Sequence, residues 1–164
     1  HDEIRFWADY VAPDRKRSAY IYDDSGRRGG LPARADFVIA GDLNSDPLDG
    51  DSVPGATDQL LDHPRVNDHD APSSLGGPWA AALQGGVNAT HQSDPAFDTA
   101  DFDDRPCCGP GNLRADYVLP SKRLRIVDSG IFWPREGDPY YYLTGNFPFV
   151  PTSDHRQVWA DLRY

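Results

Sequence analysis

The chain has 164 residues, of which 38% are hydrophobic, and this length suits one globular domain of ordinary size rather than two. Its 26 acidic and 16 basic residues give a formal charge of -10, which repels polyanions and argues against a protein that holds duplex DNA by charge alone. No apolar run approaches the roughly 18 residues of a transmembrane helix, and no signal peptide is visible. The composition therefore predicts a soluble domain without a membrane partner.

The first part of the chain combines an amphipathic helix with a long loop. Within residues 2–12, four apolar residues recur at helical spacing: Ile4, Trp7, Ala8 and Val11. Asp2 and Glu3 fall in the first turn, where the helix dipole favours acidic groups, and Pro13 ends the helix. Residues 14–34 are polar and rich in Arg and Gly, which predicts a surface loop.

A short apolar run at residues 36–40 stops before a Gly-Asp pair, which is the pattern of a strand buried on both faces. Asp42 therefore lies at the end of a strand. Residues 57–61 predict a helical turn, and residues 79–83 predict a short helix. The rest of the stretch from 64 to 104 is rich in Asp, Gly, Pro and Ser and predicts a long loop.

The last third of the chain carries three predicted strands. Residues 115–119 and 124–132 are rich in β-branched and aromatic side chains and are separated by a Pro-Ser turn, which predicts a hairpin. A loop rich in Pro, Gly and Tyr follows over residues 133–151. Residues 157–164 alternate apolar and polar side chains, which predicts a final strand with one buried face.

Three short segments place acid, amide or imidazole groups beside these predicted strands. They read GDLNSDP over residues 41–47, RADY over residues 114–117 and TSDHR over residues 152–156. Each segment alone is a weak signal, since an Asp after a strand usually forms a turn or caps a helix. Hydrolysis of a phosphate ester needs oxygen ligands for a hard cation, a group that activates water, and donors for the developing charge. Together the segments supply part of this chemistry.

In this order, from about residue 36 to residue 164, the segments resemble the C-terminal half of the endonuclease/exonuclease/phosphatase superfamily, which has the deoxyribonuclease I-like fold. The resemblance implies an α+β protein: the C-terminal half of a four-layer α/β sandwich, with two packed mixed β-sheets flanked by helices. Residues 1–164 would then be one domain whose N-terminal part is missing. The absence of Met and the start at His1 place the encoded start outside this chain.

The resemblance also implies roles for five residues. Asp42 and Asn44 would activate or orient the attacking water and hold the scissile phosphate. Asp154 would bind the metal, with Asp42 either a second metal ligand or the general base. His155 would face the phosphate, and Asp116 would orient His155 through a hydrogen bond. The implied function is hydrolysis of a phosphate ester by a phosphatase, phosphodiesterase or nuclease with Mg²⁺ or Mn²⁺, and with Ca²⁺ as a further candidate.

One family feature has no match before Asp42. The superfamily binds its principal metal through a Glu on an earlier strand, but the 41 residues before Asp42 contain no strand with such a Glu. Glu3 lies on the predicted helix and is a poor substitute. We therefore expect either a partner segment, the missing N-terminal half, or an inactive chain. The acidic charge favours a phosphomonoester or small phosphodiester over duplex DNA as substrate.

Two other functional classes stay open. Asp42-x-Asn44-x-Asp46 resembles the start of an EF-hand calcium loop, but Pro47 stands where the loop needs Gly and Val53 where it needs Glu. Weak binding of calcium through three acidic residues, Asp46, Asp49 and Asp51, remains an alternative. The other alternative is a secreted interaction domain that has lost catalysis, with the residues 140–142 (Tyr-Tyr-Tyr) as packing or rim residues.

The cysteines and histidines outside these segments give little direction. Cys107 and Cys108 are adjacent, and three states are open: two free thiols, a disulfide with each other, or a bridge to another segment. His63, His69 and His91 fit no metal-binding spacing, so we expect solvated loop residues. The family resemblance and acidic composition favour a secreted or extracytoplasmic protein.

Overall fold

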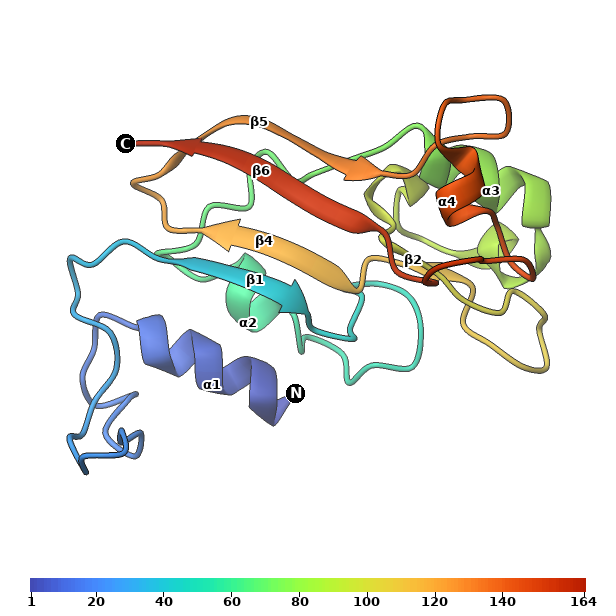
Figure 1. Cartoon of the computed structure of the whole chain (residues 1–164). Helices are drawn as coiled ribbons and strands as arrows, with labels where there is room; N and C mark the ends of the chain where they lie inside the picture. Colours follow the sequence, from blue (N-terminus) through green and yellow to red (C-terminus); the bar gives the residue numbers. More distant parts are fainter.

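The computed structural model describes residues 1–164 (Figure 1). Its helices are α1 (Asp2–Val11), α2 (Asp58–Leu61), α3 (Gly76–Gln84) and α4 (Tyr141–Thr144), with 3₁₀ helices η1 (Gly86–Thr90) and η2 (Pro95–Phe97). Its strands are β1 (Val38–Asp42), β2 (Ala100–Asp101), β3 (Asn112–Leu113), β4 (Asp116–Pro120), β5 (Arg125–Phe132) and β6 (Gln157–Arg163). This mixture of helices and small sheets is an α+β fold. None of the helices has the length and apolarity needed to cross a membrane.

The strands form antiparallel pairs that do not follow the chain order. β1 pairs with β4, β2 with β3, and β5 with β6. The predicted hairpin between β4 and β5 is therefore wrong, although both strands exist. Hydrogen bonding between β4 and the chain of β1 continues beyond Pro120, because the Ser121 N–H donates to the carbonyl of Phe37 at 2.9 Å. β6 lies between β5 and β4, so the end of the chain separates two strands that are neighbours in sequence (Figure 1).

β1 is exposed on one face, contrary to the prediction that both faces are buried. Only Ile39 is buried, whereas Val38 is 44% exposed and Ala40 and Asp42 are also open to solvent. Alternate residues of a strand point to opposite faces, so one face meets the helices and the other has no cover in this chain. Asp42 is the last residue of β1, which confirms its predicted place at a strand end.

The main core joins α1 and α2 to the inner face of β1 and β4. Ile4, Ala8 and Val11 of α1 pack there. Its other buried members are Ile39, Ala56, Leu60, Val66, Tyr117 and Leu119. Trp7 was predicted on the same helix face but is 42% exposed. The buried stripe of α1 is narrow and follows the spacing of Ile4, Ala8 and Val11, which leaves Trp7 at its edge. A smaller cluster under α3 contains Ala80, Ile131 and Trp133.

Two of the polar residues predicted in loops have definite structural positions. His63 is 3% exposed and its Nδ1 accepts the Arg65 N–H at 3.2 Å, so its prediction as a solvated residue is wrong. Burial at the end of α2 lowers the pKa of His63, with nearby Arg17 and Arg65 acting in the same direction. His91 is half-buried and its Nε2 contacts the Pro110 carbonyl at 2.8 Å, while His69 is exposed as predicted.

The adjacent cysteines are joined to each other. Cys107 and Cys108 form a disulfide in the exposed loop between β2 and β3, one of the three states that the sequence left open. The Cys108 N–H donates to the Arg105 carbonyl at 2.8 Å, and the Arg105 side chain pairs with Asp103. The loop is thus closed on itself by local contacts.

A fully buried ion pair ties three parts of the fold together. Asp101 at the end of β2 and Arg156 before β6 lie 2.7 Å apart, and neither side chain has exposed surface. The other contacts of the Asp101 carboxylate are the Gln84 amide at 2.7 Å and the Phe147 N–H at 3.1 Å. Arg156 also stacks on the Trp133 ring at 4.6 Å. Burial raises the pKa of Asp101 and lowers the pKa of Arg156, so each charge depends on its partner.

We predict that Asp101→Ala lowers the free energy of unfolding by about 3–5 kcal/mol, because it leaves the Arg156 charge buried and unpaired. Urea unfolding measures this loss. The matched control is Asp138→Ala, which breaks the half-exposed pair with Arg135 and should cost less than about 1 kcal/mol. Equal losses in the two variants would contradict the structural role given to Asp101.

Candidate functional site

Two carboxylates meet across the β1–β4 ladder. Asp42 ends β1 and Asp116 begins β4, and the antiparallel register sets them directly opposite each other. Side chains opposite each other across a ladder have Cβ atoms about 5 Å apart on the same face of the sheet. Gly41, immediately before Asp42, has a φ of 141°, which residues with a side chain rarely adopt. The Gly of the GDLN segment therefore permits the backbone turn that presents Asp42.

The histidine reaches these carboxylates from a third segment. A β-bridge pairs His155 with Ala100, and the Arg156 N–H donates to the Thr99 carbonyl at 2.7 Å. The His155 Nδ1 then lies 2.8 Å from Asp116 Oδ2. The hydrogen bond predicted between these two residues is therefore present in the structure. An ionised carboxylate can only accept, so Nδ1 carries the hydrogen and Nε2 is left for another partner.

Electrostatics favour the charged form of this imidazole. Burial of the ring acts to lower the pKa of His155, but the hydrogen bond and charge of Asp116, with the charges of Asp42 and Asp154, outweigh it and raise the pKa. The ring of Phe102 packs edge-on against His155 with the ring centroids 5.4 Å apart. His155 is thus held between a carboxylate and an aromatic ring, in a site rich in negative charge.

Thr99 supports this arrangement and was not predicted. Its side chain is 2% exposed, and its hydroxyl donates to Asp116 Oδ2 at 3.0 Å. The Thr99 hydroxyl oxygen in turn accepts the backbone N–H groups of Ala115 and Asp116 at 2.9 and 2.8 Å. Asp116 therefore has one fixed orientation, with Oδ2 shared by Thr99 and His155. Nothing in the sequence signalled Thr99, since it precedes a strand of only two residues.

The loop after β1 is fixed by contacts to β4. Asn44 has a left-handed backbone, with a φ of 47°, and its N–H donates to Asp42 Oδ1 at 2.7 Å. This conformation suits Asn better than most residues. The buried Tyr117 hydroxyl lies 2.8 Å from the carbonyl oxygens of Ser45 and Arg114. These contacts hold the GDLN segment in place and leave the exposed Asn44 side chain at its surface.

Asp154, the other predicted metal ligand, lies near His155 but outside the group of Asp42, Asp116 and His155. Asp154 is exposed, and its carbonyl accepts the Asp101 N–H at 2.8 Å. Its charge acts on His155, but its carboxylate is not among the groups that converge on one point. Glu3 is exposed on α1 and does not join them either. The catalytic and metal-binding roles of Asp42, Asn44, Asp116, Asp154 and His155 stay predictions.

The acidic residues of the calcium alternative have other partners. Asp46 accepts the N–H groups of Leu48, Asp49 and Arg114 at 2.8 to 2.9 Å. Asp49 accepts from the backbone of Gln92 and from both backbone and hydroxyl of Ser93. These carboxylates stabilise loops, and Asp51 is exposed apart from them. No observation favours calcium binding there.

The central three residues suit a divalent cation. Asp42, Asp116 and His155 each offer one ligand atom within 4.8 Å of the other two. Two carboxylates and a neutral imidazole are ligands that Mn²⁺ accepts, and the carboxylates suit Mg²⁺. The donor set therefore fits a metal in this position, with the identity of the ion left open.

Comparison with known proteins identifies the family. The profile of the Endonuclease/Exonuclease/phosphatase family matches residues 4–155. The chain belongs to this family. Searches of curated proteins and of solved structures each gave no match. Endonuclease/Exonuclease/phosphatase proteins are mostly hydrolases of phosphoesters that depend on a divalent metal, and the Asp42, Asp116 and His155 group lies within the matched region.

We predict that Asp116 and His155 of this Endonuclease/Exonuclease/phosphatase chain act as one unit. Asp116→Asn should keep the fold but misorient the imidazole, and so lower kcat/KM for a phosphoester by about 10- to 100-fold. In a His155→Ala background the same change should cost little more, because coupled groups are not additive. The three variants are compared in one assay. Penalties that multiply would show that the two residues work independently.

Asp98 is a buried acid. It is 1% exposed, and its Oδ1 has no hydrogen-bond partner. Burial, together with the charges of Asp46, Asp49 and Asp94, raises the pKa of Asp98 to about 8. The pKa in the unfolded chain is about 3.9. Between these two values the folded state holds a proton that the unfolded state has released, so folding becomes less favourable as the pH rises.

We therefore predict that the free energy of unfolding falls between pH 4 and pH 8 by on the order of 1 kcal/mol per pH unit because of Asp98. Asp98→Asn should flatten this slope. Urea unfolding at four pH values from 5.5 to 8.5 measures it, and Asp24→Asn, at an exposed loop position, is the control. The same slope in Asp98→Asn and in the unchanged protein would refute the assignment.

Proposed function

We propose that this protein hydrolyses a phosphate ester with the help of Mg²⁺ or Mn²⁺. The observation that carries the proposal is the convergence of Asp42, Asp116 and His155 from three separate segments. Family membership supports the reaction class. No observation favours an interaction domain without catalysis.

In the proposed reaction a water oxygen forms a bond to phosphorus as the ester P–O bond breaks. Asp42 takes the proton of the water through the carboxylate oxygen that the Asn44 N–H leaves free. The Nε2–H of a protonated His155 donates to a phosphate oxygen, and Asp116 holds the ring in that orientation. The departing oxygen takes a proton from solvent, which gives an alcohol and phosphate.

A metal held by Asp42 and Asp154 would supply positive charge to the phosphate oxygens. The exposed Asn44 amide would bind the phosphate from the other side of the loop. Holding a metal by Asp42, Asp116 and His155 would require a neutral imidazole and would remove the Nε2–H donor that this reaction uses. The proposed reaction therefore requires Asp154, which makes Asp154 the informative position for mutation.

We further propose that the catalytic unit includes a segment N-terminal to His1. The exposed outer face of β1, with Val38 and Ala40, is the surface that such a segment would cover, as the second sheet of a four-layer sandwich. Trp159 of β6, at 38% exposed, would add to the covered area. The segment would also provide the Glu ligand that this chain lacks.

We propose a small phosphoester as substrate, and a secreted or extracytoplasmic location. The charge of -10 opposes the approach of duplex DNA. The Cys107–Cys108 disulfide suits an oxidising compartment, where such bonds persist.

We predict that Mg²⁺ or Mn²⁺, and not Ca²⁺ alone, supports hydrolysis of methyl phosphate or dimethyl phosphate by the full-length encoded protein. Asp154→Ala should lower kcat/KM by at least about 100-fold, since it removes a side chain that would bind the metal directly rather than one that only orients a ligand. Asp161→Ala, at an exposed position of β6, is the control. Undiminished activity of Asp154→Ala, or activity in excess chelator, would contradict the proposal.

A further inference from the structure

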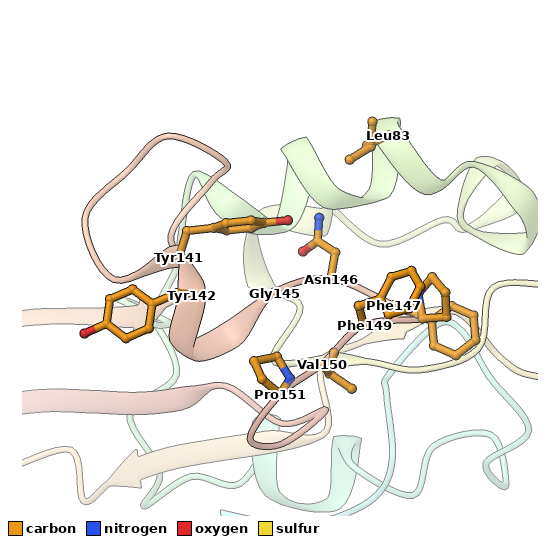
Figure 2. A pocket seen from close by; sticks show the side chains of 10 residues that line it. Leu83, Tyr141, Tyr142, Gly145, Asn146, Phe147, Phe149, Val150 and Pro151 are labelled. Atoms are coloured by element: carbon orange, nitrogen blue, oxygen red, sulfur yellow. The ribbon is translucent and has the colours of Figure 1, made fainter.

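A pocket of about 730 Å³ lies between α3 and the loop that follows α4 (Figure 2). Six of its ten lining residues are hydrophobic, among them Leu83, Phe147, Phe149 and Val150, and none carries a charge at neutral pH. Charged residues make up 26% of the chain, so their absence here sets the pocket apart from the rest of the surface. Pockets of about 300–1,000 Å³ with apolar walls are typical binding sites for small organic molecules.

One polar group in this wall has a free donor. Asn146 is 7% exposed, and its Oδ1 accepts the indole N–H of Trp133 at 3.4 Å. An indole can only donate, which fixes the amide with Nδ2 on the other side. Nδ2 has no hydrogen-bond partner. Figure 2 shows this nitrogen directed toward the region between Tyr141 and Leu83. A buried donor without a partner is unfavourable, and an acceptor on a ligand would satisfy it.

The pocket is joined to the catalytic group through Asp101. The Asp101 carboxylate accepts the N–H of Phe147 in the pocket wall at 3.1 Å, and its own N–H donates to the Asp154 carbonyl at 2.8 Å. The next residue, Phe102, packs against His155. Pro151 in the pocket wall precedes Asp154 by only three residues, which span at most about 11 Å. His155 follows Asp154 directly, so Pro151 in the pocket wall lies within about 15 Å of His155 along the chain.

We propose that this pocket binds the organic part of the substrate: an uncharged apolar group, aryl or alkyl, with one hydrogen-bond acceptor for Asn146. The phosphate would lie at Asp42 and His155. This inference rests on the proposed phosphoesterase function. The pocket has no cationic side chain, so it does not suit the phosphate backbone of a nucleic acid.

The test compares three primary alkyl phosphates with the full-length encoded protein: methyl, hexyl and 3-phenylpropyl phosphate. Their leaving groups react alike, so a difference in kcat/KM reports the organic group. Burial of several CH₂ groups, at about 0.8 kcal/mol each, should raise kcat/KM of the larger esters at least about tenfold above methyl phosphate. The hexyl and phenylpropyl arms distinguish an alkyl from an aryl occupant.

Variants of residues in the pocket wall test whether the gain in kcat/KM of the larger esters arises there. Phe149→Ala and Leu83→Ala, at residues 82% and 63% exposed, should each reduce the ratio of large to methyl ester at least about threefold. Tyr22→Ala, an aromatic that is 69% exposed in the loop before β1, is the matched control and should keep the ratio. A 3-phenylpropyl phosphate with a carbonyl group on its phenyl ring would offer Asn146 an acceptor. Asn146→Leu should abolish any additional gain in kcat/KM that this carbonyl gives.

The outcomes separate this inference from the proposed function. Equal turnover of all three esters, or an unchanged ratio in Phe149→Ala and Leu83→Ala, would overturn the pocket assignment and leave the phosphoesterase function standing. Failure to hydrolyse any of the esters with Mg²⁺ or Mn²⁺ would overturn both.

Discussion

The buried pair of Asp101 and Arg156 is the constraint on which the site depends. Neither side chain has exposed surface, so each charge must find its contacts inside the protein, and those contacts fix the surrounding chain. The Asp101 carboxylate binds the end of α3 through Gln84 and the α4 loop through Phe147. Arg156 follows His155 directly, so the position of the guanidinium limits where the imidazole can lie. This ion pair holds neighbouring segments together, as the hydrophobic core does elsewhere in the fold, and it requires a more specific geometry.

The sequence predicted local structure well and pairing poorly. α1 and α2 could be predicted because helical spacing and terminal residues are encoded within a few positions. The strands β4 and β5 could be predicted for the same reason. Their partners could not, because β6 begins 25 residues after β5 ends and its insertion between them leaves no local trace. The burial of β1 was misjudged because an apolar run does not say whether one or two layers cover it.

Prediction of the site followed the same division. The family resemblance predicted one site that contains Asp42, Asn44, Asp116, Asp154 and His155. Three of them, Asp42, Asp116 and His155, converge because a register pair and a β-bridge bring their segments together. Thr99 and Asp101 were missed because their roles arise from contacts that the short strand β2 makes with the segment before β6. His63 was misjudged because burial beside α2 depends on the tertiary packing of α1. The residues of the sequence motifs were thus easier to predict than the residues that hold them in place.

The central position of β6 has a consequence for synthesis. A ribosome releases the chain from its N-terminal end, so β1, β4 and β5 emerge while β6, which pairs with β5 and lies beside β4, is still inside the exit tunnel. Until residues 154–163 are free, β5 has an unpaired edge and Asp116 has no imidazole beside it. The group of Asp42, Asp116 and His155 is therefore complete only after β6 has emerged, and until then the chain holds the β1–β4 pair and an unpaired β5.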